Sequence, residues 1–339
     1  MRKALHRGSF PYSRMRRLRS SPSIRNLVAE TEISVHDLIL PLFVIDGVNQ
    51  CQPVKSMPGI KRLSIDLLLK EVVEAESLGI STVALFPVIP KSLKTGTAEE
   101  SYNDNGLIQT AIRELKVNAP MIGIIADVAL DPYTVHGHDG IINECSGYVL
   151  NDATNEILVK QALSLAYAGA DIVAPSDMMD GRIGIIREKL EEAGFENTKI
   201  MAYAAKYASG YYGPFRDAIG SATSRSIIDK STYQLDFRNV KEALHECSLD
   251  LSEGADMLLI KPGMPYLDVL KSVVDEFAVP TFAFQVSGEY AMHCAAFDNN
   301  WLPREQIILE SLTTFKRAGA TGILTYFARE AAHLLSKST

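Results

Sequence analysis

Residues 199–206, with the sequence KIMAYAAK, and residues 255–262, with the sequence ADMLLIKP, are short apolar runs that each end at or beside a lysine. Runs of this length and composition are typical of buried β-strands. Residues 183–193, which precede the first run, have apolar side chains three and four positions apart, and this spacing predicts a helix. Alternation of helix and strand along a chain indicates a parallel sheet.

The same alternation extends through the chain of 339 residues from about residue 38. Helical spacing also occurs at residues 65–78 and 157–168, between short apolar or β-branched runs. The eight predicted strands are residues 38–44, 82–88, 121–128, 170–177, 199–206, 255–262, 280–287 and 322–326. Eight strand–helix units predict closure into an α/β TIM (β/α)8 barrel.

Glycines at the ends of four predicted helices support this fold. A residue just beyond a helix often needs a positive φ, which glycine adopts without strain. The four are Gly79, Gly169, Gly254 and Gly319. The alternative is a doubly wound open sheet, for which we would expect a glycine-rich phosphate loop after the first strand. The sequence there, IDGVNQ at residues 45–50, contains no such motif.

The overall composition excludes several classes of protein. The formal net charge is −7, which argues against a nucleic-acid partner for the protein as a whole. The four cysteines lie far apart in the sequence, which argues against a disulfide framework and fits a reducing cytoplasm. No apolar run approaches the roughly 20 residues that span a bilayer, so we expect no membrane partner.

The N-terminal segment differs in composition from the rest of the chain. Residues 1–25 contain eight basic residues and no Asp or Glu. An organelle transit peptide, a nucleic-acid arm or an extension that docks on a partner subunit could have this composition. Phe10, Tyr12 and Leu18 favour docking, because a purely electrostatic tail would not need apolar side chains. We therefore predict an arm for oligomer contacts at residues 1–35 and a catalytic barrel at residues 36–339.

Polar side chains gather where the predicted strands end, which is the mouth where active sites of this fold form. A single polar residue there is usually a solvated rim residue. The set is Asp127, Ser176, Asp177, Lys206, Lys261, Ser287 and Tyr326. Because neighbouring strands lie about 4.8 Å apart, two lysines that end neighbouring strands enter the same mouth.

Two lysines in one mouth have a chemical use. Burial and a nearby like charge both lower the pKa of a lysine, and a free amine can attack a carbonyl carbon. The arrangement therefore predicts Schiff-base formation with a keto substrate. The alternative is that Lys206 or Lys261 only pairs with a carboxylate such as Asp177.

The segments that follow Lys206 suggest how a substrate could be held. Residues 207–216 are rich in glycine and aromatic residues, and such a loop can close over a small ligand. Arg216, Lys230 and Gln234 come next, and two cations with an amide suit a carboxylate. Taken alone, these three could also be solvated loop residues.

Long motifs around these residues resemble the porphobilinogen synthase family, also called the 5-aminolevulinate dehydratases, through nearly the whole chain. The motifs lie at residues 127–140, 176–182, 206–216, 256–268 and 285–290. The resemblance implies a lyase that condenses two 5-aminolevulinate molecules to porphobilinogen with loss of two waters, in tetrapyrrole biosynthesis. It also implies a homo-octamer whose N-terminal arms wrap neighbouring barrels.

The resemblance gives individual residues their roles. It implies that Lys206 forms the Schiff base with the substrate that supplies the propionate side of the product, whose carboxylate Ser287 and Tyr326 bind, and that the other substrate supplies the acetate side. It implies that Lys261 forms the Schiff base with the other substrate. The remaining implied residues are Arg216, Lys230 and Gln234 for the second carboxylate, Asp127, Ser176 and Asp177 for the pocket lining, and Tyr212 and Phe215 for the lid.

Metal use is where the sequence departs from part of the family. Zinc-dependent members carry three cysteines at positions that here hold Ala129, Asp131 and Asp139. Without thiolates we expect no tetrahedral zinc site, and carboxylates favour Mg²⁺ or no tightly bound metal. The alternative is that Asp131 and Asp139 only order their loop. Glu246 matches a carboxylate that holds a stimulatory Mg²⁺ in other members, so the resemblance implies a magnesium-type allosteric enzyme.

Two other functions remain compatible with the barrel and the arm. A class I aldolase would also form a Schiff base, but one lysine would suffice there. A barrel that binds RNA through its basic arm would do no chemistry. In that case removal of residues 1–25 would abolish function, whereas Lys261→Ala would not.

Overall fold

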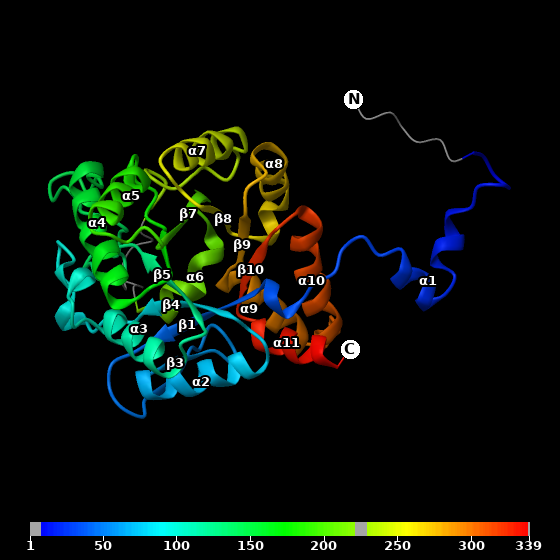
Figure 1. The fold of residues 1–339 in the computed structure, drawn as a ribbon, viewed down its shortest axis with the longest axis horizontal. Coiled ribbons are helices and arrows are strands. Elements are labelled where there is room, and N and C mark those ends of the chain that lie inside the picture. Colours follow the sequence, from blue (N-terminus) through cyan, green and yellow to red (C-terminus); the bar gives the residue numbers. More distant parts are fainter. Residues whose placement is uncertain (1–7, 221–228, 338–339) are drawn as a thin grey trace.

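Eight parallel strands close into a barrel in the computed structural model, which describes residues 8–220 and 229–337 (Figure 1). Each barrel strand pairs with the next barrel strand along the chain. Leu38 of the first strand lies opposite Ile323 of the last, and this pairing closes the barrel. The barrel strands are β1 (Leu38–Val44), β4 (Thr82–Pro87), β5 (Gly123–Val128), β6 (Ile172–Pro175), β7 (Lys199–Lys206), β8 (Met257–Lys261), β9 (Thr281–Gln285) and β10 (Gly322–Thr325). The predicted TIM barrel is confirmed.

Helices surround the barrel and cover its outer face (Figure 1). The outer helices are α2 (Ile65–Ser77), α3 (Leu107–Asn118), α4 (Asn151–Ala168), α5 (Arg182–Glu192), α7 (Lys241–Ser252), α8 (Leu267–Phe277), α10 (Arg304–Ala318) and α11 (Ala328–Ser336). Two more, α6 (Gly213–Ala218) and α9 (Ser287–Asp298), follow strands β7 and β9 at the mouth. All four glycines predicted to end helices have positive φ, for example +105° at Gly169 and +108° at Gly319.

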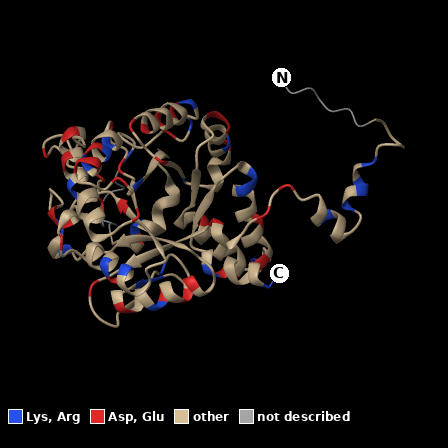
Figure 2. Cartoon of the chain, in the orientation of Figure 1, with Lys and Arg blue, Asp and Glu red and all other residues tan. Residues whose placement is uncertain are grey.

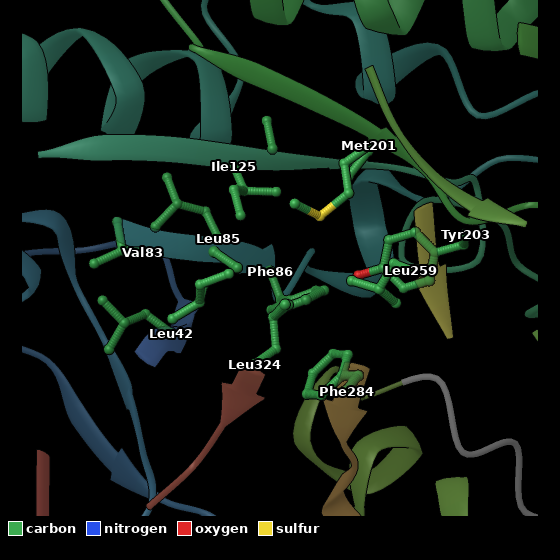
Figure 3. Close-up of a cluster of buried hydrophobic side chains, with 14 of the residues drawn as sticks. Leu42, Val83, Leu85, Phe86, Ile125, Met201, Tyr203, Leu259, Phe284 and Leu324 are labelled. Atoms are coloured by element: carbon green, nitrogen blue, oxygen red, sulfur yellow. The ribbon is translucent and has the colours of Figure 1, made fainter. Parts of the chain in front are cut away.

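The barrel interior is a packed core. Figure 3 shows Leu42, Leu85, Ile125, Met201 and Leu324 converging from five different strands. All five are almost completely buried. Close packing of this kind leaves no channel through the barrel, so a ligand site has to lie at one end of it.

Several predicted strands are shorter in the structure than in the sequence pattern. Strand β6 ends at Pro175, so Ser176 and Asp177 lie in the loop after it, and Ser287 is the first residue of helix α9. The predicted strands were too long because the sequence gives no clear signal, such as glycine, at the points where β6 and β9 end. A small hairpin, β2 (Cys51–Pro53) and β3 (Lys61–Leu63), joins the edge of β1 and was not predicted.

The described part of the N-terminal arm begins at residue 8 and projects away from the barrel (Figure 1), except for its last residues, of which Ile33 and Val35 pack against the core. Residues 1–7 of the predicted arm, and residues 338–339 of the predicted barrel region, lie outside the described residues. The arm carries the short helix α1 (Pro22–Leu27) and a series of basic residues (Figure 2). Its apolar side chains are exposed: Tyr12 is 85% and Leu27 79% accessible. Among the described helices, none has the length and apolar character needed to cross a membrane.

Candidate active site

Lys206 and Lys261 are partners in the parallel register of β7 and β8, and each is the last residue of its strand. Both side chains are buried, with 5% of each residue accessible. The sequence prediction that the two lysines enter one mouth is therefore correct. Their surroundings, however, differ.

Lys261 lies among aromatic rings. Its Nζ is 4.9 to 5.4 Å from four ring centroids. The rings are those of Tyr203, Tyr212, Phe215 and Phe284. Burial, together with the nearby charge of Lys206, lowers the pKa of Lys261 to about 7, although Asp127 opposes the change. Near neutral pH a large fraction of this amine is therefore unprotonated and able to act as a nucleophile.

Lys206 has polar partners instead. Its Nζ donates to Asp139 Oδ1 at 3.3 Å and to the main-chain oxygen of Ser176. The alternative considered from the sequence was that one of the lysines only pairs with a carboxylate such as that of Asp177. In the structure the carboxylate beside Lys206 is that of Asp139.

Asp139 is the centre of a buried charge cluster. Its Oδ2 lies 2.7 Å from Lys230 Nζ and accepts a hydrogen bond from Tyr233 Oη at 3.0 Å. Lys230 Nζ is also 3.4 Å from Asp131 Oδ2. Burial alone would raise the pKa of Asp139, but the ammonium groups of Lys206 and Lys230 outweigh it and hold that pKa well below its ordinary value. Two carboxylates and two ammonium groups neutralise each other in this cluster.

Asp131 and Asp139 were predicted as possible metal ligands, and that role stays a prediction. Their oxygens already contact the ammonium groups of Lys230 and Lys206, which a divalent cation would have to displace. Within residues 8–220 and 229–337, no three His, Cys, Asp or Glu side chains converge as a metal-binding group. The alternative, that the two aspartates order the active-site loop, would predict the same pairing with lysines.

Three buried polar atoms near the lysines have no hydrogen-bond partner among the described residues. They are Asp127 Oδ1, Gln234 Oε1 and Tyr326 Oη. An unpaired buried polar atom is costly in free energy unless a ligand or water satisfies it. All three belong to residues that the sequence analysis assigned to substrate binding.

Two buried carboxyl groups border the mouth and titrate near neutrality. Burial raises the pKa of Asp127 to about 6, against the attraction of Lys261 and Lys206. Burial also raises the pKa of Asp177 to about 6, against the attraction of Arg182. Carboxyl groups in this range can both accept and donate protons at neutral pH.

The predicted lid residues lie above Lys261. The main-chain N–H of Phe215, at the start of α6, donates to Ser287 Oγ at 2.9 Å, and Ser287 Oγ donates to the main-chain oxygen of Tyr211 at 3.3 Å. Tyr212 Oη donates to the main-chain oxygen of Lys261 at 3.1 Å. Arg216 is half-buried on α6, and the described chain stops at residue 220 before it resumes ahead of Lys230. The lid therefore contacts the strand end that carries Lys261.

Glu246 lies apart from the lysines, on α7. It lines a cavity of about 210 Å³ with Asp180 and Glu242. Burial raises the pKa of Glu246, and Arg182 opposes this effect. Arg182 is itself buried between Asp250 and Asp177, so one guanidinium group lies between the Glu246 cavity and the active-site mouth.

Sequence reasoning missed two contributors to the site. Tyr203 lies three positions before Lys206, and regular alternation would place the two side chains on opposite faces of the strand. A register shift between Ala202 and Ala205 changes the alternation, which no local pattern signals. Glu289 was also missed, although it lies within the motif at residues 285–290 that supplied Ser287.

Comparison with known proteins agrees with this geometry. The family model described as delta-aminolevulinic acid dehydratase matches residues 12–334. The chain belongs to the delta-aminolevulinic acid dehydratase family. A relative of that name from Bradyrhizobium diazoefficiens is 54% identical over 322 residues, which cover 95% of this chain and 90% of the relative. The chloroplastic enzyme of Chlamydomonas reinhardtii is 49% identical, over 96% of this chain and 85% of its own.

A solved structure of the family has the same fold throughout. The delta-aminolevulinic acid dehydratase of Toxoplasma gondii, crystallised with the reaction product porphobilinogen, superposes with a TM-score of 0.94 at 49% identity. The match covers 96% of this chain and 92% of the Toxoplasma chain. The predicted activity is confirmed: this dehydratase is a lyase that condenses two 5-aminolevulinate molecules to porphobilinogen, the pyrrole from which tetrapyrroles are built.

Proposed function

We propose that Lys206 and Lys261 each form a Schiff base with one of the two 5-aminolevulinate molecules that the enzyme condenses. The observation that carries this proposal is the register pairing of two buried lysines, one of which has a pKa of about 7. Attack of each free amine on a substrate keto carbon, followed by loss of the carbonyl oxygen as water, gives an imine. The resulting iminium carbon activates the neighbouring carbon for bond formation.

The contacts suggest which group of carboxylate-binding residues serves the substrate at each lysine. Lys206 and Lys230 both contact Asp139. This shared contact supports a pairing of Lys206 with the carboxylate-binding group predicted from Arg216, Lys230 and Gln234. Lys261 contacts the rings of Phe215 and Phe284. Phe215 donates to Ser287, and the Phe284 ring lies 5.9 Å from that of Tyr326. This grouping is the reverse of the one that the resemblance implied, and it is the one we propose.

Proton transfers fall to the buried carboxyl groups. Asp127 and Asp177 both have a pKa of about 6, and Asp127 interacts electrostatically with both lysines. We assign Asp127, with Ser176 beside Lys206, to proton transfer and polar lining of the pocket. Tyr212 and Phe215 cover Lys261 and exclude water from its imine, which would otherwise hydrolyse.

We also propose that Mg²⁺ stimulates the enzyme at Glu246, and that the active-site loop needs no zinc. The acidic cavity at Glu246 supports this role, because Mg²⁺ prefers one or two carboxylates with several waters. Bound Mg²⁺ would add positive charge near Arg182, which interacts with Glu246 and contacts the carboxylates of Asp250 and Asp177.

The arm supports a proposal about assembly. The described part of the arm carries several arginines (Figure 2), and exposed apolar side chains such as Tyr12 and Leu27 lie near them in the sequence, as a subunit-docking extension requires. We propose a homo-octamer held by residues 1–35. The four free cysteines fit a reducing compartment, and we propose the cytoplasm.

Borohydride reduction in the presence of 5-aminolevulinate, followed by peptide mapping, tests the roles of the lysines. The reducing agent converts an imine into a stable secondary amine on the lysine that formed it. We expect adducts on Lys206 and Lys261 and on no other lysine. Lack of an adduct on either one would remove that lysine from the mechanism.

A further inference from the structure

We propose that Glu289 is a positioning residue for Lys261, because its carboxylate fixes the turn that directly follows this lysine. The inference rests on the proposed function of Lys261 as a Schiff-base residue. The described hydrogen bonds of the Glu289 carboxylate all go to main-chain N–H groups and none to the lysine side chain. Glu289 acts through the main chain.

The carboxylate of Glu289 joins two separate turns at the mouth. Its Oε1 accepts the main-chain N–H of Met264 at 2.6 Å. Its Oε2 accepts the N–H of Gly263 at 3.2 Å and that of Val286 at 2.7 Å. Gly263 and Met264 follow strand β8, whereas Val286 follows strand β9. Glu289 is completely buried, so no solvent competes for these three donors.

Two of these bonds go beyond what helix α9 needs. An acidic residue in the first turn of a helix commonly accepts the N–H of the capping residue, and the bond from Val286 is of this kind. The bonds from Gly263 and Met264 instead reach the turn after another strand. Helix α9 does not require these two bonds, and the turn that they fix is the one that follows Lys261.

The main chain of Lys261 is also held on the opposite side. Its carbonyl oxygen accepts the N–H of Tyr207 at 3.0 Å and the hydroxyl of Tyr212 at 3.1 Å. The turn has little room to shift, because a Cβ at Gly263 would lie 2.6 Å from a ring carbon of Phe315. The carbonyl oxygen of Lys261 thus has two fixed partners, and Glu289 fixes the next two N–H groups along the chain, those of Gly263 and Met264.

The chemistry needs an acceptor with two oxygens at this position. A carboxylate accepts at both oxygens, whereas a glutamine amide would turn an N–H₂ donor toward at least one main-chain N–H. Burial raises the pKa of Glu289 to about 7 in spite of the three bonds, so the carboxyl group is about half charged at pH 7 and mostly charged above it. Displacement of a reacting group by about 1 Å can lower a rate by about 100-fold.

The test compares adducts on the two lysines in the same sample. In Glu289→Gln we expect borohydride trapping with 5-aminolevulinate at Lys261 to fall by about tenfold or more relative to trapping at Lys206. Lys206 serves as an internal reference, because its own contacts are to Asp139 and Ser176. We expect kcat to fall in parallel, with the KM for 5-aminolevulinate changed by less than about threefold.

Two matched variants separate positioning from general effects. Glu330→Gln makes the same change on the first turn of α11, where the carboxylate pairs with Arg304 near the surface. Leu115→Ala opens a cavity at a fully buried site on α3 and so supplies a destabilised control. Neither should alter the ratio of the two adducts.

Glu289→Asp keeps the charge and shortens the side chain by one methylene, so it tests the same point if Glu289→Gln does not fold. We expect its adduct ratio to lie between those of the unsubstituted enzyme and Glu289→Gln. An unchanged ratio in a folded Glu289 variant would overturn the inference. Absence of a Lys261 adduct in the unsubstituted enzyme would instead overturn the proposed role of Lys261, and the inference with it.

Discussion

Lys206 and Lys261 lie opposite each other in adjacent strands, yet only Lys206 contacts a carboxylate among the described residues. Lys261 is surrounded by four aromatic rings instead. Both amines are withdrawn from solvent, and the charge on one disfavours the charge on the other. One mouth thus holds two lysines of different electrostatic character, as two separate Schiff bases would require.

Replacement of either lysine should abolish the reaction. We expect Lys206→Ala and Lys261→Ala each to reduce porphobilinogen formation by at least about 10³-fold, because each removes a nucleophile. Lys199→Ala is a suitable control, since Lys199 is exposed at the opposite end of β7. Retention of more than about a tenth of the activity in Lys206→Ala would indicate a single-lysine mechanism, as in the aldolases.

The pH dependence of trapping should reveal the depressed pKa of Lys261. The amine must be unprotonated to attack, so the rate of adduct formation at Lys261 should increase about tenfold per pH unit below the pKa and level off above it. With a pKa of about 7, the plateau should begin near pH 8. An ordinary lysine would continue to increase to about pH 10. Rapid mixing with 5-aminolevulinate and borohydride over this range would distinguish the two.

The buried charge cluster should contribute to stability. Asp139→Asn leaves the buried ammonium of Lys206 without its carboxylate partner, which should lower the free energy of unfolding by about 3–5 kcal/mol. Asp131→Asn should have a smaller effect, because Asp131 contacts Lys230 alone and at the longer distance of 3.4 Å. Urea denaturation followed by circular dichroism measures both. Equal losses would contradict a central role for Asp139.

Magnesium should act through Glu246 and not through the active-site loop. After chelation we expect activity to fall and Mg²⁺ to restore it, whereas Glu246→Gln should keep its basal activity and lose the response. Glu253→Gln, on the same side of the barrel but outside the cavity, is a matched control. Full restoration by Zn²⁺ alone would contradict our assignment for Asp131 and Asp139.

The arm should determine the size of the assembly. Removal of residues 1–30 should leave a folded barrel, because the described part of the arm projects away from it (Figure 1) and the core contacts of Ile33 and Val35 are kept. We expect a species smaller than an octamer in sedimentation velocity. Exchange of Phe10, Tyr12 and Leu27 for serine should also reduce the size of the assembly. Exchange of three arm arginines for glutamine should reduce it less. An octamer that survives both changes would exclude the arm as the main contact.

Much of the fold followed from local patterns in the sequence. Strand and helix alternate with the spacing that each requires, and glycines such as Gly169 and Gly319 end helices with a positive φ. Strand boundaries were less certain, because the predicted strands included Ser176 and Ser287, which lie beyond the ends of β6 and β9. The hairpin of β2 and β3 was missed, since all three residues of β2 are exposed and show no apolar pattern.

The sequence by itself determined that two lysines end neighbouring strands, because strand order in a barrel follows chain order. Only the tertiary structure decided that Lys206 pairs with Asp139 and that Lys261 lies among rings from β7, the lid and β9. A residue's spacing shows which face of its own element it occupies. The electrostatic surroundings that determine its pKa come from side chains distant in sequence, and here also from the register shift between Ala202 and Ala205, which changes the alternation between Tyr203 and Lys206.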